Sequence, residues 1–249
     1  MVISTPAPTY SLSRVGGSLK RSIMRDLLKH AVDPTILSLA GGLPAADALP
    51  VTEYAACLQT VLARDGAKAL QYAPMSMPLR EWIASYMQSR GVDCTAEQVF
   101  ITNGNQQGLS ILTRLFLNPS DTALIENVVF TGIQQSVQAA DANIIAVPTD
   151  PIQGIDLDAL ETGMQRGAKL AVVIPDFHNP LGVTLSANSR ERIAQMAAYY
   201  GVPVVEDDAY SALRFAGESL PPIKAYDAAG WVFYIGSFSK MLAPGLRLG

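Results

Sequence analysis

The 249-residue sequence lacks several features that mark specialised classes of protein. Its two cysteines, Cys57 and Cys94, are too few for a disulfide framework and have no metal-binding spacing, so we expect a reducing, cytoplasmic setting. Lysines and arginines form no run, and the formal net charge is −4, so we expect neither a nucleic-acid nor a membrane partner. The start shows no charged-then-apolar leader, and no apolar run is long enough to cross a bilayer.

What the sequence does contain is a series of short apolar runs that alternate with helix-like segments. Hydrophobic residues make up 49% and charged residues 16%, which is enough to bury a substantial core. The expected strands span residues 99–102, 123–125, 144–147, 170–174, 202–206 and 231–235. Short, continuously apolar strands of this kind are typical of parallel sheets covered on both faces. The pattern therefore predicts an α/β fold with a three-layer, mostly parallel sheet.

Helical periodicity and turn residues divide the rest of the chain. Residues 1–20 are expected to form an irregular arm, and Gly41 and Gly42 break a short extended piece at 36–40. Thr52 is the expected N-cap of one helix, and Gly91 is expected to end another. The expected helices span residues 22–30, 52–63, 79–90, 106–117 and 189–200. We divide the chain into an arm with a short helix, residues 1–50, and a large domain, residues 51–249.

Polar and glycine-containing motifs follow nearly every expected strand. They occupy residues 102–107, 126–130, 175–182, 206–210 and 236–249. Because parallel sheets bind ligands at the carboxyl ends of their strands, these motifs are expected to share one site.

The last motif carries the clearest chemistry. Lys240 follows two hydroxyl residues, Ser237 and Ser239, and Arg247 comes seven residues later. A lysine amine can form a Schiff base with an aldehyde, and an arginine can bind a phosphate with two hydrogen bonds. By themselves, however, these residues are better explained as a surface lysine and a structural arginine in a loop.

Two further motifs are also ambiguous when read alone. The strand-to-helix turn at 102–107 could bind phosphate through free N–H groups or could be an ordinary helix start. The adjacent acids Asp207 and Asp208 could suggest a divalent metal, but too few further oxygen ligands lie nearby in the sequence. We therefore expect no metal site.

Taken together and in order, the motifs resemble those of fold type I aminotransferases of class I and II, which depend on pyridoxal 5'-phosphate (PLP). The resemblance covers about residues 20–249 and is to the branch that includes 2-aminoadipate and kynurenine aminotransferases. It implies the large domain of a PLP-dependent transferase, which moves an amino group from an amino acid to a 2-oxo acid, within a homodimer. Since such enzymes continue past the lysine motif, we expect this large domain to be incomplete at its C-terminal end and the small domain to be missing.

The resemblance also implies roles for individual residues. Lys240 would hold PLP as a Schiff base and shuttle the substrate proton, and Asp207 would pair with the pyridine nitrogen. Tyr210 and Asn179 would hydrogen-bond the ring oxygen, and Phe130 would stack on the ring.

The remaining cofactor contacts implied by the resemblance surround the phosphate. They come from Gly104, Asn105, Gln106, Ser237, Ser239 and Arg247, and from Tyr72 of the neighbouring subunit. In the arm, Arg25 and Gly42 would contact the substrate, although Arg25 could equally lie on a solvated helix face. Two other functions use the same scaffold: a non-catalytic domain that senses an effector, and a PLP-dependent lyase or decarboxylase.

Overall fold

The computed structural model of the chain describes residues 10–18, 33, 35–36 and 41–249. The predicted helix at 22–30, most of the extended piece at 36–40 and the candidate residue Arg25 lie outside these residues. A five-stranded sheet forms the centre, with the strand order β2-β1-β5-β6-β7 and every neighbouring pair parallel. Its strands are β1 (Thr122–Glu126), β2 (Asn143–Val147), β5 (Leu170–Val173), β6 (Val204–Asp208) and β7 (Val232–Gly236).

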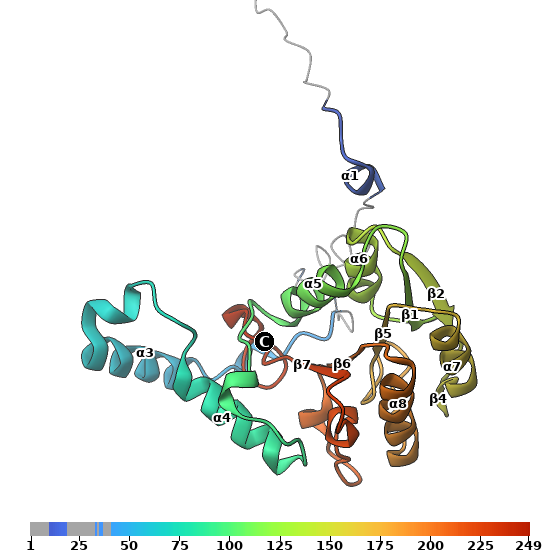
Figure 1. Cartoon of the computed structure of the whole chain (residues 1–249). Coiled ribbons are helices and arrows are strands. Elements are labelled where there is room, and N and C mark those ends of the chain that lie inside the picture. Colours follow the sequence, from blue (N-terminus) through green and yellow to red (C-terminus); the bar gives the residue numbers. More distant parts are fainter. Residues whose placement is uncertain (1–9, 19–32, 34, 37–40) are drawn as a thin grey trace, which may run out of the picture.

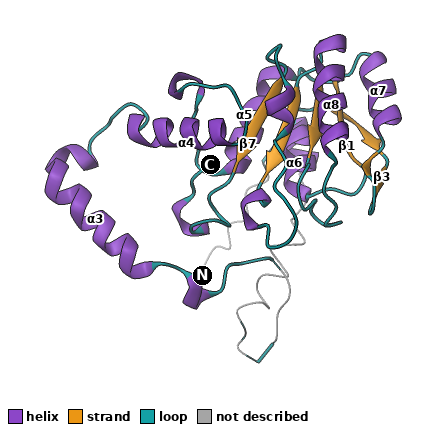
Figure 2. Cartoon of the chain, turned by 90° about the horizontal axis from the view of Figure 1, so that it is seen from below, coloured by secondary structure: helices purple, strands orange, loops and turns teal. Residues whose placement is uncertain are grey.

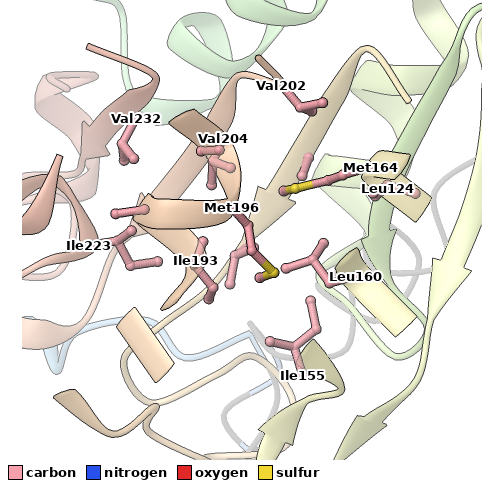
Figure 3. Packing of buried hydrophobic residues seen from close by; sticks show 14 of the residues in the cluster. Leu124, Ile155, Leu160, Met164, Ile193, Met196, Val202, Val204, Ile223 and Val232 are labelled. Atoms are coloured by element: carbon pink, nitrogen blue, oxygen red, sulfur yellow. The ribbon is translucent and has the colours of Figure 1, made fainter. Parts of the chain in front are cut away.

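Helices cover both faces of this sheet, which confirms the predicted three-layer architecture (Figures 1 and 2). Successive strand residues point to opposite faces, so Leu124 packs in one buried cluster and Ile125 in the other. Figure 3 shows the cluster of Leu124, where Leu160 and Ile193 come from the covering helices. The second cluster contains Leu109 and Ile133. The helices are α5 (Asn105–Phe116) and α6 (Thr131–Ala139) on one face, and α7 (Leu157–Gln165) and α8 (Ala187–Tyr200) on the other.

Local capping explains where the second pair of helices begins and ends. Asp156 accepts hydrogen bonds from two N–H groups in the first turn of α7. The hydroxyl of Ser186 does the same for α8, which ends at Gly201 with a φ of 64°. The sequence did not lead us to expect α6 or α7, because each is only 9 residues long and has few apolar positions.

The helices that precede the sheet match their predictions closely. They are α3 (Val51–Asp65) and α4 (Met77–Ser89), and Gly91 follows α4 with a φ of 89°. The predicted N-cap Thr52 is wrong, because α3 begins at Val51 after Pro50 and has no side-chain cap. The arm, predicted to be irregular, contains the short helix α1 (Arg14–Ser18).

Among the described residues, no helix has the length and apolar character needed to cross a membrane.

The smaller elements connect these helices and strands. A short hairpin joins β3 (Thr149–Asp150) to β4 (Gly154–Ile155). Single 3₁₀ turns are η1 (Ala46–Ala48), η2 (Gly66–Leu70), η3 (Ala96–Gln98), η4 (Ser211–Leu213), η5 (Ile223–Tyr226) and η6 (Pro244–Leu246).

The predicted strand at 99–102 is not formed. A strand needs a neighbouring backbone along its length. Here only Thr102 has one: its N–H donates to the Gly249 carbonyl (2.8 Å) and its carbonyl accepts from the Gly249 N–H (3.1 Å). Within the described part of the chain the sheet ends at β7, so the other residues of this segment stay unpaired.

A close approach between α7 and β1 generates a prediction about stability. A Cβ atom at Gly163 would lie 2.6 Å from Leu124 Cδ2, and Leu124 is buried in the core. Gly163→Ala should therefore destabilise the chain by about 1–3 kcal/mol, even though alanine is the better helix former. Urea unfolding measures this, with Thr162→Ala on the exposed side of α7 as the control. A variant as stable as wild type would show that Leu124 moves aside at no cost.

Candidate functional site

The parallel sheet brings the predicted motifs to one edge. Because β1, β5, β6 and β7 run in the same direction, the loops that follow them lie on the same side of the molecule. The loops after β5, β6 and β7 carry Asn179, Tyr210 and Lys240 in turn. The start of α5 meets the end of β6 at this edge, where Asn105 reaches Asp207.

Asp207 is the buried acid of this edge. It is the fourth residue of β6, and one of its carboxylate oxygens accepts a hydrogen bond from the Asn105 side-chain amide. The pKa of Asp207 is raised to about 7, mainly by burial and also by the neighbouring acids Asp208 and Glu126, against the lowering effect of the hydrogen bond from Asn105. Such a carboxyl group can gain or lose its proton near neutral pH, and a cationic N–H partner would favour its charged form.

The N–H groups at the start of α5 and the guanidinium group of Arg247, which both attract negative charge, lie side by side. Gly104 precedes the helix with a φ of 80°, and a Cβ atom there would lie only 2.7 Å from Arg247 Nη2. Glycine therefore allows the guanidinium group to approach the first turn of the helix, whose N–H groups have no partner within the helix. Within the described ranges, no acidic group pairs with Arg247. A helix start and an unpaired guanidinium together suit a phosphate group.

Lys240 lies where a carbonyl-bearing ligand could reach it. Its amine donates a hydrogen bond to the carbonyl oxygen of Gly42, 2.6 Å away, which brings the arm to the site. Partial burial lowers the pKa of Lys240. A lower pKa increases the fraction of neutral amine, which is the form that attacks an aldehyde. The preceding turn is shaped by the Ser239 N–H, which donates to the Ser237 hydroxyl (3.2 Å).

The structure also brings together Asn179 and Tyr210. The Asn179 side-chain amide donates to the phenol oxygen of Tyr210 at 3.1 Å, and burial raises the pKa of this phenol. These two residues come from loops after adjacent strands, as the sequence predicted from the motif positions.

Three further predicted residues, Gln106, Phe130 and Tyr72, have the following surroundings in the structure. The Gln106 side chain donates to the Gly132 carbonyl (2.9 Å) and to the Ser136 hydroxyl (2.7 Å), so it ties α5 to α6. The Phe130 ring lies beside Gly132 at the start of α6 and is partly exposed. Tyr72 is fully exposed, on the segment between η2 and α4.

The second acid, Asp208, is a part of the site region that the sequence left unexplained. Its carboxylate accepts hydrogen bonds from Arg90 (3.1 Å) and from the hydroxyl of Tyr234 (2.9 Å). Asp207 reaches α5, whereas Asp208 reaches the end of α4, so the two acids have separate partners. Nothing near Asp208 in the sequence signalled the pairing, since Arg90 lies 118 residues away.

A cavity of about 920 Å³ lies beside the site, between α4, α5 and β7. Its wall includes Asn105 and Tyr210 but not Lys240, Asp207 or Arg247. The cavity therefore borders the cluster of loops at the strand ends and shares Asn105, Tyr210 and Ser237 with it.

The fold and the site define an α/β protein in which a lysine of lowered pKa, a buried acid and a helix start beside an arginine lie at one edge of a parallel sheet. The family model for aminotransferases of class I and II matches residues 35–249, so the chain belongs to that family. This confirms the resemblance inferred from the motifs.

Similar proteins of known name agree with this membership. The chain is 37% identical over 240 residues to aromatic-amino-acid aminotransferase 1 of Thermococcus litoralis, covering 93% of this chain and 57% of that protein. It is 38% identical over 238 residues to 2-aminoadipate transaminase of Thermus thermophilus, covering 93% and 58%. The chain thus spans somewhat more than half the length of these relatives.

Solved structures give the same result. The kynurenine aminotransferase of Pyrococcus horikoshii matches with a TM-score of 0.86 and 34% identity, over 96% of this chain and 61% of that one. The α-aminoadipate aminotransferase LysN of Thermus thermophilus, solved with N-(5'-phosphopyridoxyl)-L-leucine, matches with a TM-score of 0.85 and 37% identity, over 95% and 60%.

The opposite pKa shifts of two buried acids generate a prediction. The raised pKa of Asp207 means that it stabilises the folded chain below about pH 4, and that this contribution is lost as the pH rises through about 7. Burial alone would raise the pKa of Asp227 too, but Lys224 and backbone N–H groups lower it, so Asp227 stabilises the chain above about pH 4. At pH 8, Asp207→Asn should therefore stabilise the cofactor-free chain by about 1–3 kcal/mol, and Asp227→Asn should destabilise it.

Urea unfolding of both variants at pH 5 and pH 8 measures these effects. The benefit of Asp207→Asn should shrink at pH 5, where the wild-type carboxyl group is mostly protonated. Effects of the same sign for the two variants at pH 8 would contradict the assigned environments.

Proposed function

We propose that the chain forms the cofactor-binding part of a PLP-dependent aminotransferase, which moves an amino group from an amino acid to a 2-oxo acid. The observation that carries this proposal is the convergence of Lys240, Asp207 and the Gly104–Arg247 anion site on one edge of the sheet. When bound, PLP supplies an aldehyde and an electron-accepting ring.

The residues present fit this cofactor. Lys240 would bind the aldehyde, while Arg247 and the start of α5 would hold the phosphate. Asp207 lacks a cationic partner among the described residues, and a protonated pyridine nitrogen would provide one. Tyr210 and Asn179, already hydrogen-bonded to each other, would hold the ring oxygen.

The protein groups then have defined tasks. Asp207 would keep the pyridine nitrogen protonated, and the amine of Lys240, whose pKa is lowered by burial, would once free take the proton from the substrate Cα and deliver it to the carbon that was the cofactor's aldehyde carbon. The Gly42 carbonyl, 2.6 Å from this amine, would help to orient it toward the substrate.

The donors, the assembly and the location of the whole protein are proposed from its relatives and from exposed surfaces. The named relatives act on aromatic amino acids, 2-aminoadipate and kynurenine, so we place the donor among such amino acids.

Figure 2 shows α3 projecting from the body. This helix has no buried residue and Tyr72 is fully exposed, which supports a homodimer in which Tyr72 reaches the partner's site. The two cysteines support a cytoplasmic location.

A sensing domain is a second candidate. The chain is 30% identical over 246 residues to an uncharacterized HTH-type transcriptional regulator of Escherichia coli, covering 98% of this chain and 53% of that protein. The same site could then bind an effector through PLP without turning it over.

The lysine assignment gives a direct prediction. Lys240→Ala should abolish the visible absorbance band that appears when PLP binds covalently to a lysine, while the control Lys169→Ala on the exposed surface should retain it. Borohydride reduction followed by peptide mass spectrometry should place PLP on the peptide that contains Lys240. A band that persists in Lys240→Ala would assign the covalent link to another residue.

A second prediction separates an enzyme from a sensor. The whole protein, loaded with PLP, should convert it to pyridoxamine phosphate when 2-aminoadipate, kynurenine or phenylalanine is added, and should release the matching 2-oxo acid. Chromatography of the released cofactor measures this conversion. Saturable binding of these amino acids with no pyridoxamine phosphate formed would favour the sensing domain.

A further inference from the structure

Asp208 lies at the centre of a buried polar cluster that the proposed function does not use. One carboxylate oxygen accepts hydrogen bonds from Arg90 (3.1 Å) and from the Tyr234 hydroxyl (2.9 Å). Arg90 also donates to that hydroxyl at 2.8 Å, so the three groups form a closed triangle. The side chains of Arg90 and Asp208 are 14% and 2% exposed, so removal of one would leave the other charge buried and unpaired.

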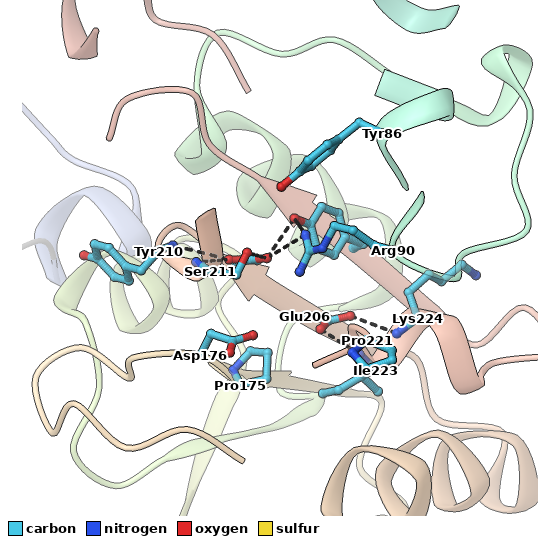
Figure 4. Close-up of polar contacts among 12 residues, drawn as sticks. Tyr86, Arg90, Pro175, Asp176, Glu206, Tyr210, Ser211, Pro221, Ile223 and Lys224 are labelled. Carbon is cyan, nitrogen blue, oxygen red and sulfur yellow. Dashed lines mark hydrogen bonds and ion pairs between the residues drawn. The ribbon is translucent and has the colours of Figure 1, made fainter. Parts of the chain in front are cut away.

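Both oxygens of Asp208 face the turn that leads into the site. The oxygen that binds Arg90 also accepts a hydrogen bond from the Ser211 hydroxyl, and the other oxygen accepts hydrogen bonds from the backbone N–H groups of Ser211 (2.9 Å) and Tyr210 (3.3 Å). Figure 4 shows Arg90 on one side of the cluster, and Tyr210 and Ser211 on the opposite side. One carboxylate therefore joins the end of α4 to the backbone of the residue whose phenol contacts Asn179.

Aromatic contacts hold α4 in the position that this cluster requires. The Arg90 guanidinium lies over the rings of Tyr86 (5.7 Å) and Tyr234 (5.5 Å). Trp82, one turn before Tyr86, stacks on it and contacts Phe238, which is two residues before Lys240. The same face of α4 thus touches the turn that carries Lys240 through Trp82, and reaches the turn that carries Tyr210 indirectly, through Arg90 and Asp208.

We propose that Asp208 and Arg90 form a positioning pair, in which Arg90 fixes the carboxylate of Asp208 and this carboxylate fixes the turn that orients Tyr210. Neither residue touches the reacting atoms. The inference rests on the proposed function only for the identity of the ligand that the Tyr210 phenol faces.

The negative charge of Asp208 favours this positioning role over one in which the pair only attaches α4 to the sheet. Burial alone would raise the pKa of Asp208, but the Ser211 hydrogen bond and the Arg90 charge lower it, so the carboxylate stays ionised. An ionised carboxylate is a stronger acceptor for the two N–H groups of the turn than a neutral one. Loss of Arg90 should therefore loosen the turn as well as the helix.

The first step of the proposal, in which Arg90 fixes Asp208 and thereby the turn, is tested by hydrogen exchange of the cofactor-free chain. In Arg90→Met, the amides of Tyr210 and Ser211 should exchange about ten- to a hundredfold faster, while peptides of β1 remain unchanged. The matched control is Arg192→Met, which removes an arginine that pairs with Asp158 and Glu161 on the surface and should leave the turn protected. Arg90→Lys and Asp208→Asn keep the volume of the cluster, and they give the same test at smaller amplitude if Arg90→Met does not fold.

The second step of the proposal, in which the turn held by Asp208 orients Tyr210, is tested by measuring PLP binding in a double-mutant cycle. Arg90→Lys should weaken PLP binding about five- to tenfold in the wild-type background, but less than about twofold in the Tyr210→Phe background, since the phenol is then already absent. Equal losses in both backgrounds would show that Arg90 does not act through Tyr210, and unchanged exchange of the turn in the folded variants would equally overturn the proposal. If the wild-type chain bound no PLP, the proposed function would fail, and the exchange experiment would still decide whether the pair holds the turn.

Discussion

Three consecutive buried carboxylates at the end of β6 are the electrostatic constraint that much of this structure satisfies. Each carboxylate is stabilised by a different partner. Backbone N–H groups of Ile223 and Lys224 bind Glu206, Asn105 binds Asp207, and Arg90 pairs with Asp208. Burying a charge is costly unless it is paired or neutralised. These partners therefore determine where η5, α5 and α4 meet the strand.

The three environments separate the carboxylates by function. Burial raises the pKa of both Glu206 and Asp207 to about 7, whereas Arg90 and Ser211 keep the pKa of Asp208 low against the same effect. Of the three, Asp207 is the carboxylate that meets the start of α5, through Asn105. A single amide partner leaves it able to interact with a cationic ring nitrogen, which is the feature that suits a PLP-binding protein.

The class I and II aminotransferase fold accommodates both enzymes and regulators among the proteins similar to this chain. Function therefore depends on the site and its supports, and not on the sheet. Here the supports are side chains such as Gln106 and Asp208, which join helices and turns behind the groups that would contact the cofactor. Because of these hydrogen bonds, the positions of the site residues depend on how α4 and α6 pack.

The sequence by itself determined the five strands of the sheet, the helices α3, α4, α5 and α8 and the motifs at the strand ends, because apolar runs and turn residues act locally. Tertiary structure decided what no local pattern specifies. The segment at 99–102 stays unpaired because strands need neighbours, and Asp208 acquires its role from Arg90, 118 residues away. Likewise, Gly104 is needed because Arg247 approaches it from the far end of the chain. Pairings between distant residues depend on how the elements pack, so only the folded chain shows them.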